Sequence, residues 1–216
     1  MGLNLRSPCI RITVQGGDSL SLTSNDRISA VSSSGNLKLE TTSGAILLKA
    51  DSLVEGCALC NTSGRFDITS ASDVILSASS QSDQSYGIYS TMSTSDSSIA
   101  GDKIKISSRS EATYAYGVTT QFSAGTTSVY GNTLKIKASS VENSLGYGIY
   151  APGGNISTTT TDSTEIEASG TGILVEDNSG FAGKADIRSY KTISVQSDST
   201  NIYGHFRKFN PLTSKG

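Results

Sequence analysis

Apolar residues recur along this chain in short alternating pairs, and equivalent pairs return about every thirty residues. One series consists of Leu20/Leu22, Ile46/Leu48, Val74/Leu76, Ile104/Ile106, Leu134/Ile136, Thr164/Ile166 and Ile193/Val195. The first members of these pairs are 26, 28, 30, 30, 30 and 29 residues apart. In most of these pairs a polar residue separates the two members, which is the alternation of a β-strand with one buried face.

Two further series run through the chain with the same period. The second series consists of Ile12, Leu39, Ile68, Ile99, Val129, Ile156 and Ile187. The third series consists of Ile28, Leu59, Ile88, Val118, Ile149, Ile173 and Tyr203, and it includes the recurring words YGIYS (86–90), YGVTT (116–120) and YGIYA (147–151). Three interleaved series with one period predict three short strands in each repeat.

Stacking such repeats predicts an all-β fold, a three-faced parallel β-helix of about seven coils of 26–31 residues. No segment sustains the apolar stripe of a helix. Equivalent side chains on successive coils should form ladders, with Ile88, Val118 and Ile149 inside the tube. Tyr86, Tyr116 and Tyr147 are expected on the same side of their strands as these residues. The glycines that follow the tyrosines should face the opposite side, or mark a bend where another backbone comes close.

Composition refines this prediction, because 40 Ser and 23 Thr make up about 29% of the 216 residues. Such a content suggests disorder, but the regular supply of Ile, Leu, Val and Tyr argues against it. A net charge of −2 does not indicate a basic surface of the kind that binds nucleic acid or an anionic membrane. No apolar run is long enough for a membrane helix, and the first residues lack the zones of a secretory signal.

The chain ends suggest a fragment of a longer protein, since the opening MG and the closing SKG look like added residues. We expect residues 1–9 to form a cap or frayed first coil, 10–206 the β-helix, and 207–216 a tail or cut end. Cys9 is expected in that first coil. Phe206 and Phe209, which flank Arg207 and Lys208, are expected to cover the open end of the tube.

The repeats AYGVTTQFSAGTTSVYGNTLKIKASS and GYGIYAPGGNISTTTTDSTEIEAS resemble those of bacterial autotransporter passenger domains and related exoproteins secreted through a separate barrel. The resemblance covers roughly residues 10–206 and rests on repeat style. It implies a right-handed parallel β-helix displayed outside a Gram-negative cell, as an adhesin or virulence factor. It also implies an outer-membrane barrel in the full-length protein rather than in this chain.

Cys57 and Cys60 form the word CALC, for which two interpretations stay open: a small disulfide-closed turn in an oxidising compartment, or two reduced, packed thiols. A zinc site would need four ligands, and the chain offers only these two, Cys9 and His205, scattered along its length. A redox pair would need a helix N-terminus, which is not predicted here. We therefore expect no metal and no cofactor.

Catalytic chemistry finds little support in the sequence. A Ser-His-Asp triad would have to use His205, which follows the last regular coil and suits a surface or capping role. Parallel β-helices also host polysaccharide lyases and glycosidases, which need clustered acids on one face. Asp67, Asp73, Asp96 and Asp102 are the candidates, but capping of turns explains all four. We expect no catalytic residue.

A binding site is predicted where the second strand connects to the third. Counted as one step per residue along the chain, this connection takes 12 steps from Leu76 to Ile88, 12 from Ile106 to Val118 and 13 from Ile136 to Ile149. It takes only 7 steps from Ile166 to Ile173. Three consecutive longer turns should stack into one ridge rich in hydroxyls and amides. Its candidate ligand-binding residues are Gln81, Gln84, Arg109, Glu111, Glu142 and Asn143.

The function expected from these observations is that of a non-catalytic adhesin passenger, outside the cell or on its surface. Its partners would be a host glycan, a matrix protein or further copies of itself. Two alternatives remain open: a carbohydrate-active enzyme or phage tailspike on the same fold, and a purely structural stalk. Fold alone does not decide among them.

Overall fold

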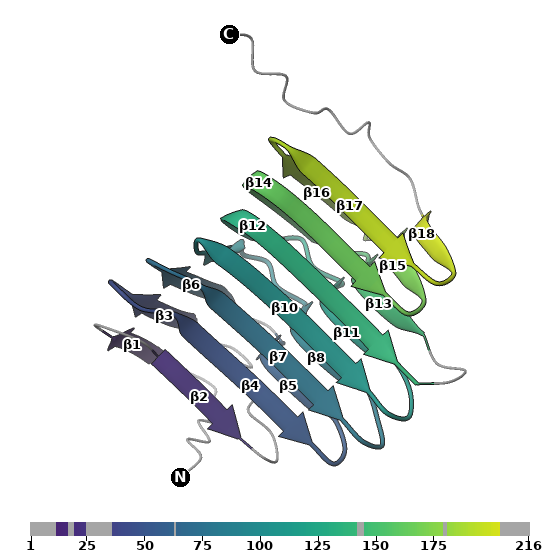
Figure 1. Cartoon of the computed structure of the whole chain (residues 1–216), viewed down its shortest axis with the longest axis horizontal. Helices are drawn as coiled ribbons and strands as arrows, with labels where there is room; N and C mark the ends of the chain where they lie inside the picture. The colour runs from purple at the N-terminus through teal and green to yellow at the C-terminus, as the bar shows by residue number, and fades with distance from the viewer. Residues whose placement is uncertain are drawn as a thin grey trace, which may run out of the picture.

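The computed structural model describes residues 12–16, 20–24, 36–62, 64–141, 145–178 and 181–203, and every regular element in them is a β-strand. Parallel strands stack coil upon coil from the N-terminal to the C-terminal end, so that residues far apart in sequence lie side by side (Figure 1). About six turns of a three-faced parallel β-solenoid result, which confirms the predicted fold class. The residues proposed for the two ends, 1–9 and 207–216, lie outside the described part.

The first and second faces together form one twelve-stranded sheet, because β12 and β14 continue from one face to the next. The strands of the first face are β1 (Ile12–Gly16), β3 (Leu37–Thr41), β6 (Phe66–Ser70), β9 (Ser97–Ala100) and β16 (Lys184–Ser189). Those of the second are β2 (Leu20–Ser24), β4 (Ile46–Ser52), β7 (Val74–Ser80), β10 (Lys103–Ser110) and β17 (Thr192–Ser197). The two shared strands are β12 (Thr126–Ser140) and β14 (Asn155–Ala168).

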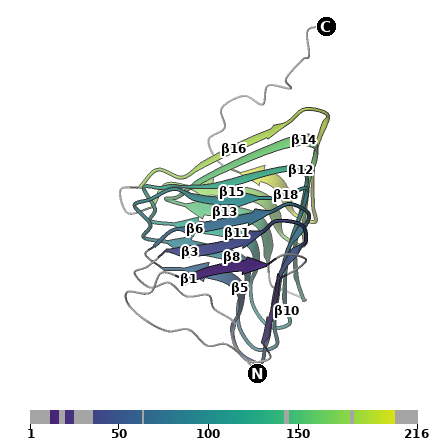
Figure 2. The same ribbon diagram turned by 90° about the vertical axis from the view of Figure 1, so that its left-hand side faces the viewer.

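The third face is a separate six-stranded sheet, seen beyond the second face in Figure 1 and from another side in Figure 2. Its strands are β5 (Gly56–Asn61), β8 (Ser85–Thr91), β11 (Ala115–Gln121), β13 (Gly146–Pro152), β15 (Thr171–Glu176) and β18 (Thr200–Tyr203). All of its pairings are parallel. Ile28, the predicted first member of this face, lies outside the described residues.

The register of the second face matches the prediction in every coil. Ile104 pairs with Val74 and Leu134, and Thr164 pairs with Leu134 and Ile193. The outward columns follow from the same register: Lys135 Nζ lies 3.1 Å from Glu165 Oε2, and Lys137 Nζ lies 3.2 Å from Glu167 Oε2. Lys135 also reaches Glu167, at 2.7 Å. Lys135 and Lys137 therefore both form ion pairs with the next coil.

Three predicted ladder members are wrong. Leu39 pairs with Val14 rather than Ile12, and Val129 pairs with Thr158 rather than Ile156. Each error is a slip of two residues, which keeps a side chain on the same face and so leaves the alternation intact. On the third face the partner of Ile173 is Ile202. Tyr203, one residue further on, is exposed.

The core is one continuous apolar column inside the tube. Leu, Ile and Val from all three faces fill it, and Ile88, Ile104 and Ile149 are fully buried. Some inward positions carry hydroxyls instead, and Thr160 and Thr164 share a hydrogen bond of 3.0 Å between their Oγ1 atoms. Backbone hydrogen bonds between coils and this ladder of branched side chains make the solenoid a rigid support for its turns.

Candidate functional site

The three longer turns do stack at one corner of the tube, as the step counts predict. Residues 81–84 connect β7 to β8, 111–114 connect β10 to β11, and 141–145 connect β12 to β13, whereas only 169–170 separate β14 from β15. Backbone hydrogen bonds join each turn to the end of the strand in the coil before it, from Glu111 N to Ser80 O at 3.0 Å and from Val141 N to Ser110 O at 3.3 Å. We call these three turns the ridge.

Four of the six residues proposed for the ridge lie in the described part of the chain. Gln81 and Glu111 are exposed in their turns, whereas Gln84 is half-buried and accepts a hydrogen bond from the Tyr86 hydroxyl. Arg109 lies in β10 rather than in a turn, and its Nη2 is 3.5 Å from Glu111 Oε1. The other two, Glu142 and Asn143, lie outside the described residues.

The ridge also carries exposed apolar side chains that the sequence analysis did not single out. Tyr114, Val141 and Leu145 have 41%, 40% and 39% of their surface exposed. Hydroxyls and amides were expected here, but these three residues form a contrasting apolar component. The missed signal was that a large apolar residue in a turn, outside the alternating strands, has no inward position to occupy.

Beside the ridge, the outer surface of the third face carries a column of aromatic rings. Tyr86 stacks on Tyr116 with ring centroids 5.1 Å apart, and Tyr116 stacks on Tyr147 at 5.3 Å. Tyr150 stacks on Tyr116 at 5.4 Å, and Tyr89 lies 4.9 Å from Tyr86. These five rings form the tyrosine face. The expected stacking of equivalent tyrosines is confirmed.

The side of the strand predicted for these tyrosines is wrong. Tyr86 and Tyr89, three residues apart, both face outward, whereas Ile88 between them is fully buried in the core. A Cβ added to Gly87 would lie 2.5 Å from Ile106 Cγ2, so Gly87 also faces inward. Two successive inward residues break the alternation. The glycine therefore marks a bend with a close approach, which was the second of the two expected roles.

Burial changes the acid–base character of the tyrosine face. Desolvation raises the pKa of both Tyr86 and Tyr116 well above the ordinary value for a phenol, and neighbouring tyrosines raise it further. The pKa values of Tyr147 and Tyr150 are raised as well, chiefly by burial. All four phenols are therefore neutral at physiological pH and keep a hydroxyl proton to donate.

Tyr114 connects the ridge to the tyrosine face. Its ring centroid lies 6.1 Å from that of Tyr116 and 6.3 Å from that of Tyr147, with the ring planes tilted by 39° and 41°. The ring thus rests against the stack while much of its own surface is exposed to solvent. Tyrosine held in this way offers contact area together with a polar tip at little conformational cost.

Cys57 and Cys60 form a disulfide, with their Cα atoms 6.0 Å apart. They pair in register with Tyr86 and Tyr89, so the disulfide continues the column of outward side chains by one coil. Both cysteines are buried in contact with the tyrosine cluster. Their place in strand β5 differs from the helix N-terminus of redox-active pairs.

Three of the four acidic residues weighed for catalysis have side-chain partners. Asp96 accepts a hydrogen bond from Thr126 N at 2.8 Å, and Asp102 accepts one from the Asn132 amide. Asp67 lies within strand β6 and pairs with Arg65 at 3.2 Å, so the prediction that it caps a turn is wrong. Within the described ranges, His, Cys, Asp and Glu form no group of three that could hold a metal ion.

Cys9, His205 and the segment Phe206–Phe209 lie outside the described ranges. No family model, curated protein or solved structure matches the chain.

The part of the chain that the structure describes contains no helix with the length and hydrophobicity that crossing a membrane requires.

Proposed function

We propose that this chain is a non-catalytic binding segment of a bacterial protein displayed on the cell surface or secreted, of the autotransporter-passenger kind. In this proposal the solenoid is a rigid spacer, and the ridge meets a host glycan, a matrix protein or another bacterial surface. An outer-membrane barrel would belong to the full-length protein. The observation that carries the proposal is the exposed Tyr114 ring, held on the ridge by a stack of buried tyrosines.

The physical basis is the low cost of ordering such a surface when it binds. Tyr114 already rests against Tyr116 and Tyr147, so a partner that covers it has little side-chain entropy to remove. Val141 and Leu145 add exposed apolar area on the next turn, while Gln81 and Glu111 supply polar groups around it. Apolar centres with polar rims are typical of protein interfaces.

The Cys57–Cys60 disulfide supports the proposed location. Disulfides form and persist in oxidising compartments, among them the bacterial periplasm and the cell surface. Here the bond lies in the wall of the solenoid and continues the tyrosine column, so it belongs to the fold rather than to a mobile loop.

Shortening the ridge tests the proposal. Each of the three connections would be cut to the seven-step length found between Ile166 and Ile173, and folding would be verified by a strand-rich circular dichroism spectrum and a cooperative melt. We expect the folded, shortened protein to lose adhesion to cells and glycan surfaces that bind the wild-type protein. Unchanged adhesion by the folded, shortened protein would remove the ridge as the binding site.

A further inference from the structure

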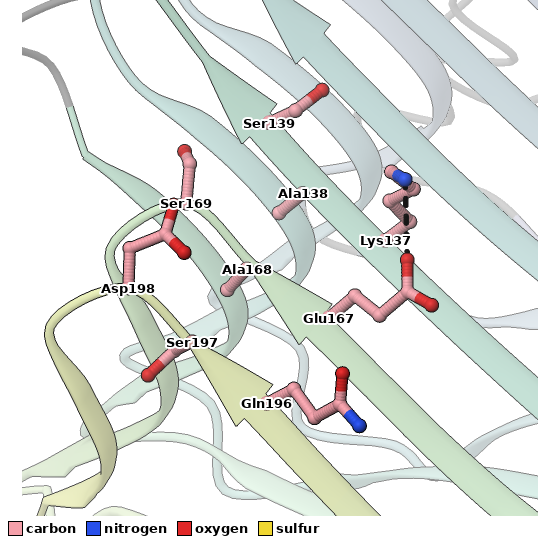
Figure 3. Close-up of a pocket in the computed structure, with 9 residues that line it drawn as sticks. All are labelled: Lys137, Ala138, Ser139, Glu167, Ala168, Ser169, Gln196, Ser197 and Asp198. Atoms are coloured by element: carbon pink, nitrogen blue, oxygen red, sulfur yellow. Dashed lines mark ion pairs between the residues drawn. The ribbon is translucent and has the colours of Figure 1, made fainter.

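A hollow of about 440 Å³ opens beside the ridge, at the C-terminal ends of β12, β14 and β17 (Figure 3). Its volume falls within the ~300–1,000 Å³ of small-molecule sites. The lining residues come from three successive coils: Lys137, Ala138, Ser139, Glu167, Ala168, Ser169, Gln196, Ser197 and Asp198. We call this hollow the notch.

The notch exists because the turns at this corner shorten abruptly. The turn after β12 spans residues 141–145, whereas the turns after β14 and β17 span only 169–170 and 198–199. Ala168, the last residue of β14, pairs with Ala138, two residues before the end of β12. The next coils therefore step back below the ridge and leave this corner open.

The polar groups of the notch divide into fixed and unpaired ones. Glu167 is held by Lys135 at 2.7 Å and Lys137 at 3.2 Å, and these lysines lower the pKa of its carboxyl to about 2. Gln196 and Asp198 make no side-chain hydrogen bond or ion pair with any other described residue. In Figure 3 Asp198 lies in the short turn after β17, next to Ser169, whereas Gln196 lies on β17, next to Glu167.

We propose that the notch is a second binding site, independent of Tyr114, and that its ligand is a neutral saccharide. A sugar ring presents hydroxyls that both donate and accept hydrogen bonds. The amide of Gln196 supplies a donor and an acceptor, Asp198 and Glu167 supply acceptors, and Ser139 supplies a hydroxyl.

The charges of the lining decide against acidic sugars. The lining contains one lysine, Lys137, and two carboxylates, Glu167 and Asp198. Lys137 is already paired with Glu167, and Lys135, which also pairs with Glu167, is shared with Glu165. The carboxylate or sulfate of an acidic sugar would therefore be repelled by a site of net negative charge. It would also lose hydration without gaining a cationic partner in the notch. A neutral polyol avoids this cost, and the open, aromatic-free lining predicts weak, millimolar binding.

Ligand-observed saturation-transfer NMR tests the proposal with a panel of neutral hexoses, their disaccharides, and the matching uronic acids as acidic counterparts. The variant is Gln196→Ala combined with Asp198→Ala, which removes both unpaired groups from exposed positions without altering the core. Ser107→Ala is the matched control, because Ser107 lies in the same outward column as Gln196, three coils earlier. Thermal melts verify that each protein is folded.

We expect wild-type protein and Ser107→Ala to show transfer to at least one neutral sugar, with at least a tenfold weaker signal for the double variant. The uronic acids should give less transfer than their neutral counterparts. The proposal is overturned if no neutral sugar binds the wild-type protein at millimolar concentration, or if the folded double variant binds as the wild type does. Loss of adhesion in Tyr114→Ser, with sugar binding intact, would show that the two sites are distinct.

Discussion

Tyr86 and Tyr116 lie in register on adjacent coils, with their ring centroids 5.1 Å apart and their planes within 8° of parallel. The residue after each tyrosine is a glycine that faces the core. The residue after that glycine has a branched aliphatic side chain, Ile88 or Val118, which is buried in the core. The recurring tyrosine–glycine–aliphatic word therefore builds two ladders at once, an aromatic one outside the wall and an aliphatic one inside it. The glycine between them makes the change of side possible.

Gly117→Ala tests the bend between these ladders. An added Cβ would lie 2.4 Å from Ile136 Cγ2 and 2.5 Å from the carbonyl oxygen of Gly148. Ala58 occupies the same position in β5, so the bend itself accepts a Cβ, and the obstacle at Gly117 is this particular crowding. We expect a loss of about 1–3 kcal/mol in denaturant unfolding. A variant as stable as the wild type would show that Gly117 is not crowded.

Ile136→Asp tests the inward register of the second face. Ile136 is fully buried between Ile106 and Ile166, so the substitution places an unpaired carboxylate inside the core. We expect loss of the cooperative thermal transition. Ser107→Asp is the control, because Ser107 neighbours Ile106 but faces outward, and its variant should melt within a few degrees of the wild type. Equal melting temperatures for both variants would contradict the register.

The ion pairs around Glu167 predict a pH dependence. Lys135 and Lys137 lower the pKa of this carboxyl from 4.5 to about 2, so the folded state binds its proton less readily than the unfolded state. The stabilisation is therefore complete above pH 4.5 and is lost as the pH falls toward 2. The pairs are partly exposed, so they contribute less than about 1 kcal/mol.

Glu167→Gln measures this contribution directly. The melting temperatures of wild type and variant should differ at pH 7, and the difference should shrink as the pH falls from 4.5 to 2. Glu111→Gln is the control, because Glu111 is more exposed and its partner Arg109 lies 3.5 Å away. A wild-type advantage over Glu167→Gln that persists unchanged at pH 2 would contradict the assigned ion pairs.

Reduction of the Cys57–Cys60 disulfide should destabilise the N-terminal part of the solenoid only modestly. The bond closes a loop of a few residues, for which chain entropy gives about 2 kcal/mol. We expect dithiothreitol to lower the melting temperature by several degrees without loss of the strand spectrum. Cys57→Ser/Cys60→Ser should melt like the reduced protein in either buffer. If dithiothreitol still lowered the melting temperature of the double variant, the destabilisation would not come from the Cys57–Cys60 disulfide.

The sequence predicts the fold well because three series share one period. Pairs such as Ile104/Ile106 on the second face leave no ambiguity in register, and every pairing there matches. The first face shows the limit of this reasoning: Thr158 is buried at a position where Ile156, two residues away, offers a more hydrophobic candidate. Alternation cannot detect a slip of two residues, since both choices face inward.

The candidate site was less predictable, for two physical reasons. Alternation assigns Tyr86 to the side of Ile88, and it fails because the backbone bends at Gly87 and places two successive residues inward. The step counts locate the ridge correctly, but they carry no information on which side chains are exposed there. The notch follows from a difference in turn length between successive coils, and the side chains that this difference brings together become evident only in three dimensions.

The central claim is that Tyr114 on the ridge contacts the partner, and a pair of matched tyrosine variants tests it most directly. Tyr114 and Tyr130 have 41% and 46% of their surface exposed, but only Tyr114 lies on the ridge. Beads coated with wild type, Tyr114→Ser or Tyr130→Ser would be scored for adhesion to host cells, with equal melting temperatures required of all three proteins. We predict that Tyr114→Ser reduces adhesion at least tenfold while Tyr130→Ser binds as the wild type does; equal adhesion by the two variants would contradict the claim.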